Sequence, residues 1–217
     1  MIERAPVVCV VDDDAAARSS LRLLLKSLGL AAVAYDSAAS FLEGYDPYQP
    51  GCLLLDIRMA GMSGLELQQV LNQRGCITPV IFITGHADVP MAVEAMQQGA
   101  FDFLQKPFRD QELLDRVQRA IAKDHAIREQ LRGNEAIRRR LESLTAREHD
   151  VLELVATGAP NKIIAHKLGI SQRTVEIHRA RVMEKMNAES LAHLVHMTHI
   201  SAAPQASAAS SGAPRSH

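Results

Sequence analysis

The sequence contains no tryptophan and few aromatic residues of any kind, which excludes a core built on large rings. Aromatic side chains make up 4% of the 217 residues, against 47% for all hydrophobic residues. That hydrophobic share is ordinary for a globular chain, and the length allows one or two domains. We therefore expect Leu, Val, Ile, Ala and Met to fill the core.

Cysteine is scarce too, and long apolar runs are absent. Cys9, Cys52 and Cys76 form neither a CxxC pair nor a Cys/His spacing that binds metal. Cys9 and Cys52 lie in apolar, strand-like runs, which indicates a reducing, cytoplasmic setting. No signal peptide is recognisable and no apolar run reaches about 18 residues, so we expect neither secretion nor a membrane partner.

Neither half of the chain is balanced in charge, although the whole is nearly neutral. Residues 1–110 carry 8 Lys or Arg and 13 Asp or Glu, a net charge of −5. Residues 111–217 carry 16 and 12, a net charge of +4. An acidic half followed by a basic half predicts two tasks, with polyanion binding in the second half.

Residues 1–122 show a regular alternation of strand and helix patterns. Each of five short apolar runs precedes a helical pattern; the runs span residues 7–11, 31–35, 52–55, 80–83 and 101–104. Residues 52–55 are apolar at every position, as in a strand buried on both faces. This alternation predicts an α/β domain, a doubly wound (βα)5 parallel sheet with helices on both faces.

Polar residues follow four of these runs. Asp12 and Asp13 follow the first run, Asp56 the third, Thr84 the fourth and Lys106 the fifth. In an open α/β sheet the chemistry lies outside the carboxyl ends of the strands, so we expect these side chains to share one pocket. Clustered carboxylates repel one another unless a hard cation such as Mg²⁺ neutralises them, and a carboxylate can accept a phosphoryl group.

These residues make the first domain resemble a response-regulator receiver domain. The resemblance covers residues 6–122 and rests on four motifs: Val11-Asp12-Asp13-Asp14, Leu55-Asp56-Ile57-Arg58-Met59, Ile83-Thr84-Gly85-His86 and Lys106-Pro107-Phe108. It implies that Asp56 is the phosphoacceptor. It also implies that Mg²⁺ or Mn²⁺ is held by Asp12, Asp13, Asp56 and the main-chain carbonyl of Arg58. The residues implied to bind the phosphate and to switch the fold are Thr84, Lys106 and Phe103.

The loop after Asp56 departs from the family at one position. Ala60 stands where the family usually has Pro. We expect a slightly looser loop there, with its chemistry intact.

The second half contains a linker, a helical domain and a tail. Residues 123–142 have a charged helical pattern with a thin apolar stripe, which suits a helical linker; Gly133 and Asn134 are where an interruption would fall. Residues 143–200 show four helical patterns and predict an all-α domain. Residues 201–217 are rich in Ala, Ser and Pro and are expected to be a disordered tail.

The third helical pattern of this second domain predicts a contact with DNA. A helix, a tight turn containing Gly169 and another helix form the helix-turn-helix plan, whose second helix enters the major groove. We expect Val175, Val182 and Met186 to face the core. The side chains expected on the DNA side are Arg173, Thr174, Glu176, Ile177, Arg179, Ala180 and Lys185.

The second domain resembles the LuxR/NarL-type output domain over residues 143–199. The matching stretches are Leu144-Thr145-Ala146-Arg147-Glu148, Asn161-Lys162-Ile163-Ile164-Ala165 and Thr174-Val175-Glu176-Ile177-His178-Arg179. The whole chain is similar to FixJ-type regulators, which implies a two-component response regulator phosphorylated by a sensor histidine kinase. Such a protein is no enzyme beyond its own phosphorylation and slow autodephosphorylation. It is expected to dimerise on phosphorylation, bind double-stranded promoter DNA and activate transcription with RNA polymerase.

Two other functions are compatible with parts of the sequence. A regulator that binds DNA without phosphorylation would need the second domain alone, and the complete acidic set argues against it. A phosphatase of the haloacid-dehalogenase kind uses Asp, Thr, Lys and Mg²⁺ on a similar sheet, with its nucleophile in an Asp-x-Asp pattern after the first strand. Here Asp12-Asp13-Asp14 is followed by three alanines.

Overall fold

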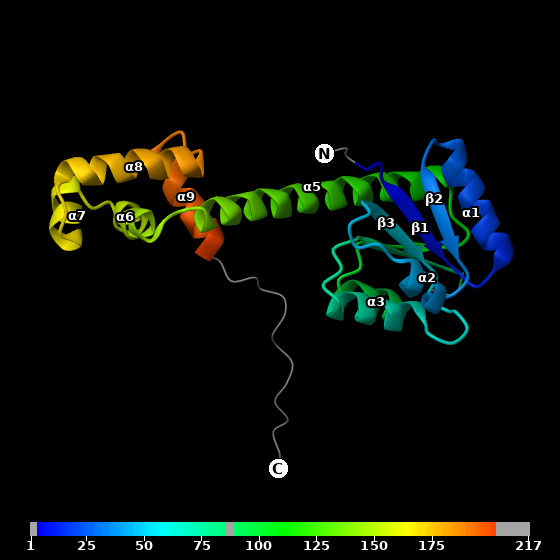
Figure 1. Ribbon diagram of the computed structural model, residues 1–217. Coiled ribbons are helices and arrows are strands. Elements are labelled where there is room, and N and C mark those ends of the chain that lie inside the picture. Colours follow the sequence, from blue (N-terminus) through cyan, green and yellow to red (C-terminus); the bar gives the residue numbers. More distant parts are fainter. Residues whose placement is uncertain (1–3, 86–88, 203–217) are drawn as a thin grey trace, which may run out of the picture. The chain divides into compact units, whose positions relative to one another are not determined.

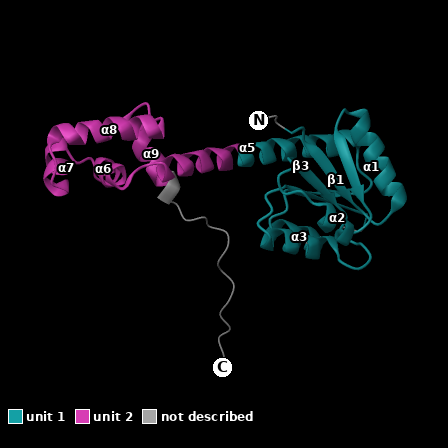
Figure 2. Cartoon of the chain, viewed as in Figure 1, with its two compact units in different colours: residues 1–128, 210–217 teal, residues 129–209 magenta. Residues whose placement is uncertain are grey.

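Strands and helices alternate along the first half of the chain, and helices alone follow (Figure 1). The computed structural model describes residues 4–85 and 89–202, which divide into unit 1, up to Arg128, and unit 2, from Glu129 (Figure 2). His86 of the third receiver-like motif and residues 203–217 of the expected tail lie outside the described residues.

The five strands of unit 1 form one parallel sheet in the order β2-β1-β3-β4-β5. They are β1 (Val7–Val11), β2 (Ala31–Tyr35), β3 (Gly51–Leu55), β4 (Val80–Thr84) and β5 (Asp102–Gln105). The helices between and after them are α1 (Ala15–Ser27), α2 (Ala38–Gly44), α3 (Gly64–Gln73), α4 (Val89–Gln97) and α5 (Asp110–Glu142). The expected doubly wound parallel sheet is confirmed.

Two apolar layers cover the two faces of this sheet. On one face, α1 and α5 pack against β1, β3 and β4; on the other, α2, α3 and α4 do so. All five residues of β3 are buried. A strand buried on both faces explains why residues 52–55 are apolar without alternation. It also fixes the position of Asp56, the residue that follows β3.

Helix α5 is a single helix of 33 residues. Its first turns pack on the sheet through the buried residues Leu113, Val117 and Ala120. Near its other end, Ile137 and Leu141 are partly buried against the core of unit 2. The helix passes through Gly133 and Asn134 without interruption, so residues 123–142 are helical as expected but continue a helix that begins at Asp110.

Unit 2 consists of the end of α5 and four further helices. These are α6 (Ala146–Ala156), α7 (Asn161–Leu168), α8 (Gln172–Met186) and α9 (Leu191–Ala202). Helices α7 and α8 are joined through Gly169, whose φ of +65° ends α7 in the left-handed region that glycine tolerates. Val175, Val182 and Met186 are buried in the core of unit 2, as predicted.

Helix α9 extends two residues into the segment expected to be the tail. Within the described ranges, no helix combines the length and the apolar character needed to cross a membrane.

Candidate functional site

Three carboxylates meet at the carboxyl ends of β1 and β3. These strands are hydrogen-bonded neighbours, and the N–H of Asp56 donates to the carbonyl of Val11 over 2.8 Å. One oxygen from each of Asp12, Asp13 and Asp56 lies within 4.8 Å of the others. Asp12 is buried, Asp56 is half-buried and Asp13 is exposed, so the cluster opens to solvent on one side.

Lys106 brings an ammonium group to this cluster from the end of β5. Its Nζ lies 2.8 Å from Oδ2 of Asp12, although the two residues are 94 positions apart in the chain. The main-chain N–H of Lys106 donates to the carbonyl of Thr84 over 2.8 Å, which ties the ends of β4 and β5 together. The ends of β1, β3 and β5 thus bring three carboxylates and an ammonium together, and the end of β4 is bonded to that of β5.

Burial and like charge act together on Asp56. They raise the pKa of its carboxyl from 3.8 to about 6: burial is the largest cause, the Lys106 ammonium opposes it, and the charges of Asp12 and Asp13 add to it. The ionised form of Asp56 is therefore less favoured than that of an aspartate in water. A cation that entered the pocket would stabilise the ionised carboxylate.

The donor set fits a hard divalent cation. Three carboxylates face one small volume, and the only ammonium beside them among the described residues contacts Asp12. Mg²⁺ takes oxygen ligands and is usually held by one or two carboxylates together with waters and phosphate oxygens. Asp12, Asp13 and Asp56 offer that chemistry. Arg58, whose main-chain carbonyl is the fourth expected ligand, lies two residues after Asp56 in the same loop.

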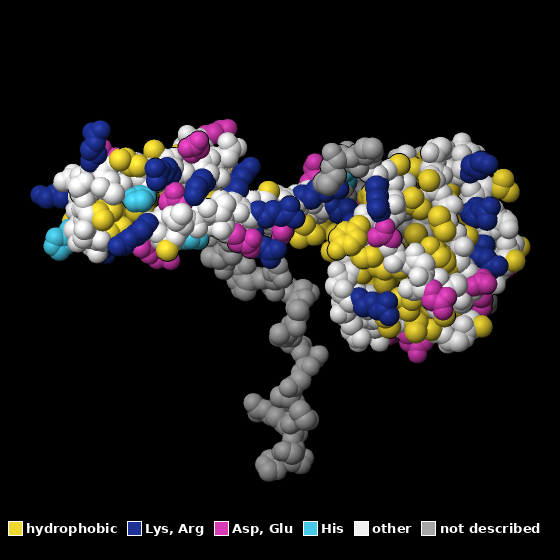
Figure 3. All heavy atoms as spheres, viewed as in Figure 1, with side chains coloured by type: hydrophobic (Ala, Val, Ile, Leu, Met, Phe, Trp, Pro, Cys, Tyr) yellow, Lys and Arg dark blue, Asp and Glu magenta, His cyan; other side chains and the backbone are white. Residues whose placement is uncertain are grey.

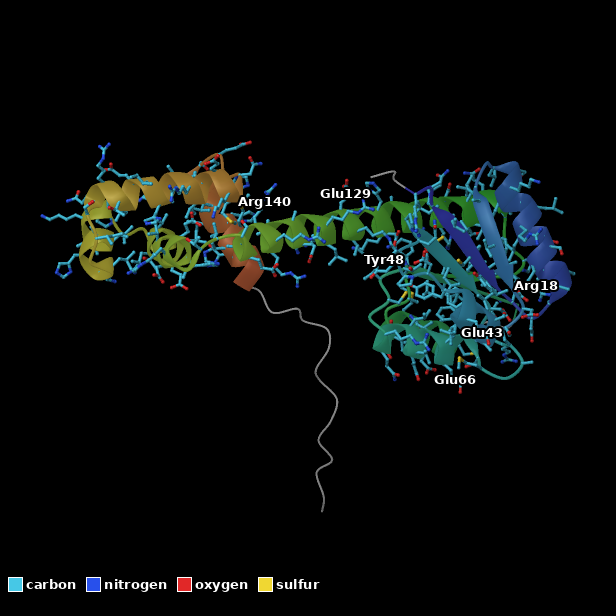
Figure 4. The ribbon with its side chains drawn as sticks, in the orientation of Figure 1. Arg18, Glu43, Tyr48, Glu66, Glu129 and Arg140 are labelled. Carbon is cyan, nitrogen blue, oxygen red and sulfur yellow. The ribbon has the colours of Figure 1, made fainter. Side chains whose placement is uncertain are left out.

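Two contacts that hold Asp12 and Asp13 were not predicted from the sequence. The N–H of Ala60 donates to Oδ2 of Asp13 over 2.9 Å. Arg18 on α1 (labelled in Figure 4) donates to the main-chain carbonyl of Asp12 over 2.7 Å. Proline at position 60 could not make the first bond, because it has no N–H. The departure at Ala60 was therefore a usable signal, whereas Arg18 has no sequence pattern that would single it out.

A close approach of backbone to backbone holds α3 against the loop. A Cβ on Gly64 would lie 2.2 Å from the carbonyl oxygen of Asp56. The N–H of Gly64 donates to the carbonyl of Ile57 over 2.9 Å. Only glycine fits there, and the contact fixes the main chain that carries Asp56.

The expected switch residues share one face of the sheet. Phe103 pairs in register with Phe82, and Thr84 follows Phe82 by two residues, so all three lie on the face covered by α2, α3 and α4. Thr84 is buried, with 1% of its surface exposed, whereas Phe103 is half-buried. The ring of Phe103 thus lies between the core and the surface near α4.

Helix α8 presents a mixed face to solvent. Of the residues expected on the DNA side, Arg173, Glu176, Ile177 and Ala180 are exposed, and Thr174, Arg179 and Lys185 are half-buried. The exposed four repeat at spacings of three and four, which places them on one side of the helix. On the visible face of unit 2, Lys and Arg side chains are scattered among acidic ones (Figure 3).

Two of the predicted cations make contacts inside unit 2. Nζ of Lys185 lies 2.6 Å from Oε2 of Glu148, and it also donates to the carbonyl of Ser143. Arg179 donates to the side-chain oxygen of Asn161 over 2.9 Å. Lys185 thereby neutralises a buried carboxylate, with 3% of the Glu148 side chain exposed. Both side chains join α8 to the rest of its unit.

One exposed cation on α8 was not among the predicted residues. Arg181 is exposed and lies one turn after Ile177. The spacing of four residues from Ile177 is the signal that could have added it to the set.

Comparison with known proteins assigns a family to each part. Residues 8–118 match the response regulator receiver domain, and residues 142–198 match the bacterial regulatory proteins of the luxR family. The chain is 48% identical to the transcriptional regulatory protein FixJ of Azorhizobium caulinodans over 197 residues, which are 91% of this chain and 93% of FixJ. It is 48% identical to nodulation protein W of Bradyrhizobium diazoefficiens over 192 residues, or 88% of this chain and 85% of that protein.

A solved structure extends the similarity to the fold. The response regulator StyR superposes with a TM-score of 0.83 at 45% identity, covering 90% of this chain and 98% of StyR.

Proposed function

Since the chain belongs to the FixJ-type response regulators, which join a receiver domain to a luxR-family DNA-binding domain, we propose that phosphorylation of Asp56 controls its dimerisation and DNA binding. The family makes the chain a two-component transcriptional regulator with a histidine kinase partner. The observation that carries the finer proposal is the meeting of Asp12, Asp13, Asp56 and the Lys106 ammonium at the carboxyl ends of β1, β3 and β5.

The proposed reaction transfers a phosphoryl group from a phosphohistidine to Asp56. A carboxylate oxygen of Asp56 forms the new O–P bond while the N–P bond to the imidazole breaks, and the imidazole keeps the electron pair of that bond. A bound Mg²⁺ would supply positive charge to the phosphoryl oxygens. Asp12 and Asp13 would hold that ion, and Lys106 would turn from Asp12 to the phosphoryl group. The residues mainly position groups and balance charge, which is most of what phosphoryl transfer requires.

The phosphoryl group would then act on the face formed by α4, β5 and α5. It brings nearly two negative charges beside Lys106 and Thr84. We expect the Thr84 hydroxyl to move toward it and the half-buried ring of Phe103 to fill the space left behind. Helix α4 already exposes nearly half of Val93 and Met96, at 48% and 46%. Apolar groups of this kind suit a dimer contact that a small shift could complete.

DNA binding is proposed for the exposed face of α8. Arg173 and Arg181 could bind phosphates or guanine edges, while Ile177 and Ala180 could contact thymine methyl groups. A single such unit makes few contacts, so affinity would come from two units on adjacent half-sites about one helical turn of DNA apart. Phosphorylation would act by supplying the dimer, and activation of transcription with RNA polymerase would follow from DNA occupancy.

Incubation with acetyl phosphate and Mg²⁺, followed by intact mass measurement, tests the central step. We expect wild-type protein to gain one phosphoryl group stably, and Asp56→Asn to gain none. The same samples are then titrated against DNA. A gain in mass together with tighter DNA binding supports the proposal.

Other outcomes of this experiment contradict it in distinct ways. Rapid release of phosphate without an adduct would indicate a phosphatase. DNA binding without any adduct would indicate a regulator that works unphosphorylated. If the Asp56→Asn variant still gains a phosphoryl group, another residue is the acceptor.

A further inference from the structure

The buried face of α5 changes character where the helix leaves the apolar core of unit 1. Leu113, Val117 and Ala120 on this face are apolar. The next two buried positions on the same face, Asp124 and Arg128, are charged. Only 1% of the Asp124 side chain and 10% of the Arg128 side chain are exposed. Charged side chains are almost never this buried unless they have a specific set of partners.

Arg128 is held by acceptors from one distant segment as well as from its own helix. Its Nε donates to Oδ2 of Asp124 over 2.7 Å. Its two terminal nitrogens donate to the carbonyls of Pro47 and Gln49, each over 3.0 Å. These carbonyls belong to the stretch that connects α2 to β3; Tyr48, labelled in Figure 4, lies between them. The planar guanidinium donates to both carbonyls at once. The ammonium group of a lysine could not make this forked contact.

Asp124 completes the contact from the other side. Its Oδ2 also accepts the N–H of Gly51, the first residue of β3, over 2.9 Å. Gly51 has a φ of +148°, and a Cβ there would lie 1.8 Å from the carbonyl oxygen of Val7. The glycine cannot be exchanged without moving β1. We call these five residues, Pro47, Gln49, Gly51, Asp124 and Arg128, the clamp.

The clamp lies away from the phosphoacceptor pocket. Gly51 begins β3 and Asp56 follows its last residue, so the two sites lie at opposite ends of this strand. After Arg128, α5 has no buried residue, and Ile137 and Leu141 are partly buried against the core of unit 2. The clamp is therefore the last buried contact that α5 makes with unit 1. Without the clamp, α5 would have no buried residue beyond Ala120 in unit 1, and a helix with few buried contacts opens more readily.

We propose that Asp124 and Arg128 are positioning residues that keep α5 helical from unit 1 into unit 2 and thereby couple phosphorylation of Asp56 to DNA binding. This inference rests on the proposed function. The pair acts by holding the helix and takes no part in the phosphoryl transfer. Its loss should separate two events that wild-type protein links, acceptance of the phosphoryl group and tighter binding of DNA.

The test uses the full chain with Asp124→Ala and Arg128→Ala combined. Removing both charges avoids leaving one buried without its partner, and alanine keeps the intrinsic helix propensity high. Three quantities are measured: phosphoryl gain from acetyl phosphate by intact mass, amide hydrogen exchange over residues 121–136, and DNA affinity with and without acetyl phosphate. The ratio of the two affinities, about 5- to 150-fold for couplings of this kind, is expected to fall to about one. Phosphoryl gain should be unchanged and exchange should be faster.

The chain offers a matched control on the same helix. Glu135 and Arg139 form an ion pair with the same spacing of four residues, but the Arg139 side chain is 75% exposed. The double variant Glu135→Ala with Arg139→Ala should keep the wild-type affinity ratio. If it loses the ratio as well, the effect is a general response to charge removal from α5 and the inference is wrong.

The remaining outcomes are also decisive. A clamp variant that exchanges faster but keeps the wild-type ratio overturns the inference. If the double variant does not fold or does not accept the phosphoryl group, the affinity ratio is measured in Arg128→Lys instead. This variant keeps the charge beside Asp124 but loses the forked contact to the two carbonyls. A wild-type ratio in Arg128→Lys then overturns the inference. Failure of the proposed function itself would be seen in wild-type protein, as no phosphoryl gain.

Discussion

At the scale of single residues, the pocket depends on how each carboxylate is held in place. Asp13 is exposed, and the N–H of Ala60 fixes its orientation by donating to its Oδ2. A carboxylate that is already oriented loses less freedom when it binds a cation. The residue at position 60 therefore affects the pocket through its main chain and not through its side chain.

Ala60→Pro removes this N–H and should weaken Mg²⁺ binding. The lost hydrogen bond is worth about 1 kcal/mol, or about a fivefold increase in Kd. Isothermal titration of the unphosphorylated protein with Mg²⁺ measures it. Ala60→Ser keeps the N–H and serves as the control. An equal Kd in the proline and serine variants would show that the bond does not organise Asp13.

Glu148 gives a prediction for the dependence of stability on pH. The Lys185 ammonium, followed by the N–H of Thr145, lowers the pKa of its carboxyl from 4.5 to about 2. A carboxyl with a depressed folded-state pKa stabilises the fold above its unfolded-state pKa, and this contribution is lost as the pH falls through the folded-state value. Wild-type protein should thus lose stability between pH 4.5 and pH 2 through this group.

The measurement compares the melting temperatures of wild type and Glu148→Gln by circular dichroism over that pH range. The variant should melt lower above pH 4.5, and the gap should close as the pH falls. A gap that is constant with pH would mean that Lys185 does not hold Glu148 in solution.

At the scale of elements, α8 carries two kinds of cation: one that is exposed to solvent and one that is bonded inside unit 2. Arg173 is exposed on the side of Ile177 and Ala180, whereas Lys185 is bonded to Glu148 and to the carbonyl of Ser143. The two cations were predicted alike from the sequence, because the period of a helix does not tell which charge has an internal partner. They should behave differently when replaced.

Arg173→Ala should cost about 1–3 kcal/mol of DNA-binding free energy and leave the melting temperature unchanged. Lys185→Ala should lower the melting temperature, because it leaves the buried Glu148 carboxylate without its positively charged partner. Fluorescence anisotropy on a DNA fragment selected by genome-wide occupancy gives the first quantity, and thermal melts give the second. If Lys185→Ala reduces DNA affinity at an unchanged melting temperature, Lys185 contacts DNA and does not stabilise the fold.

The elements differ in how far the sequence predicts them. The sheet and the meeting of Asp12, Asp56 and Lys106 follow from local patterns, because parallel strands bring their carboxyl ends to one edge. The clamp could not be predicted from the sequence, because the contacts of Arg128 join positions about 80 residues apart. A charged helical segment also has the same sequence pattern whether it packs on a neighbour or faces solvent. The Ala60 contact lies between these cases. The sequence shows that Ala60 departs from the family pattern, but it does not show that the N–H of Ala60 donates to Asp13.

At the scale of the whole molecule, phosphorylation is expected to change the oligomeric state. Acetyl phosphate with Mg²⁺ should convert wild-type protein from monomer to dimer in size-exclusion chromatography with light scattering. Asp56→Asn should fold and remain monomeric under the same conditions. Moving a two-state equilibrium from 1:99 to 99:1 takes about 5.5 kcal/mol, so a partial shift is expected if the phosphoryl group supplies less. An unchanged response in Asp56→Asn would rule out this switch.

The continuity of α5 also makes the protein sensitive to the number of residues between its two cores. Each residue inserted into 130–135 turns one end of the helix relative to the other by about 100° and lengthens it by about 1.5 Å. One or two added alanines should therefore abolish phosphorylation-dependent regulation, while seven, close to two full turns, should largely restore it. If regulation is lost and regained with the period of the helix, the rotation about the α5 axis matters for regulation and the length of α5 does not.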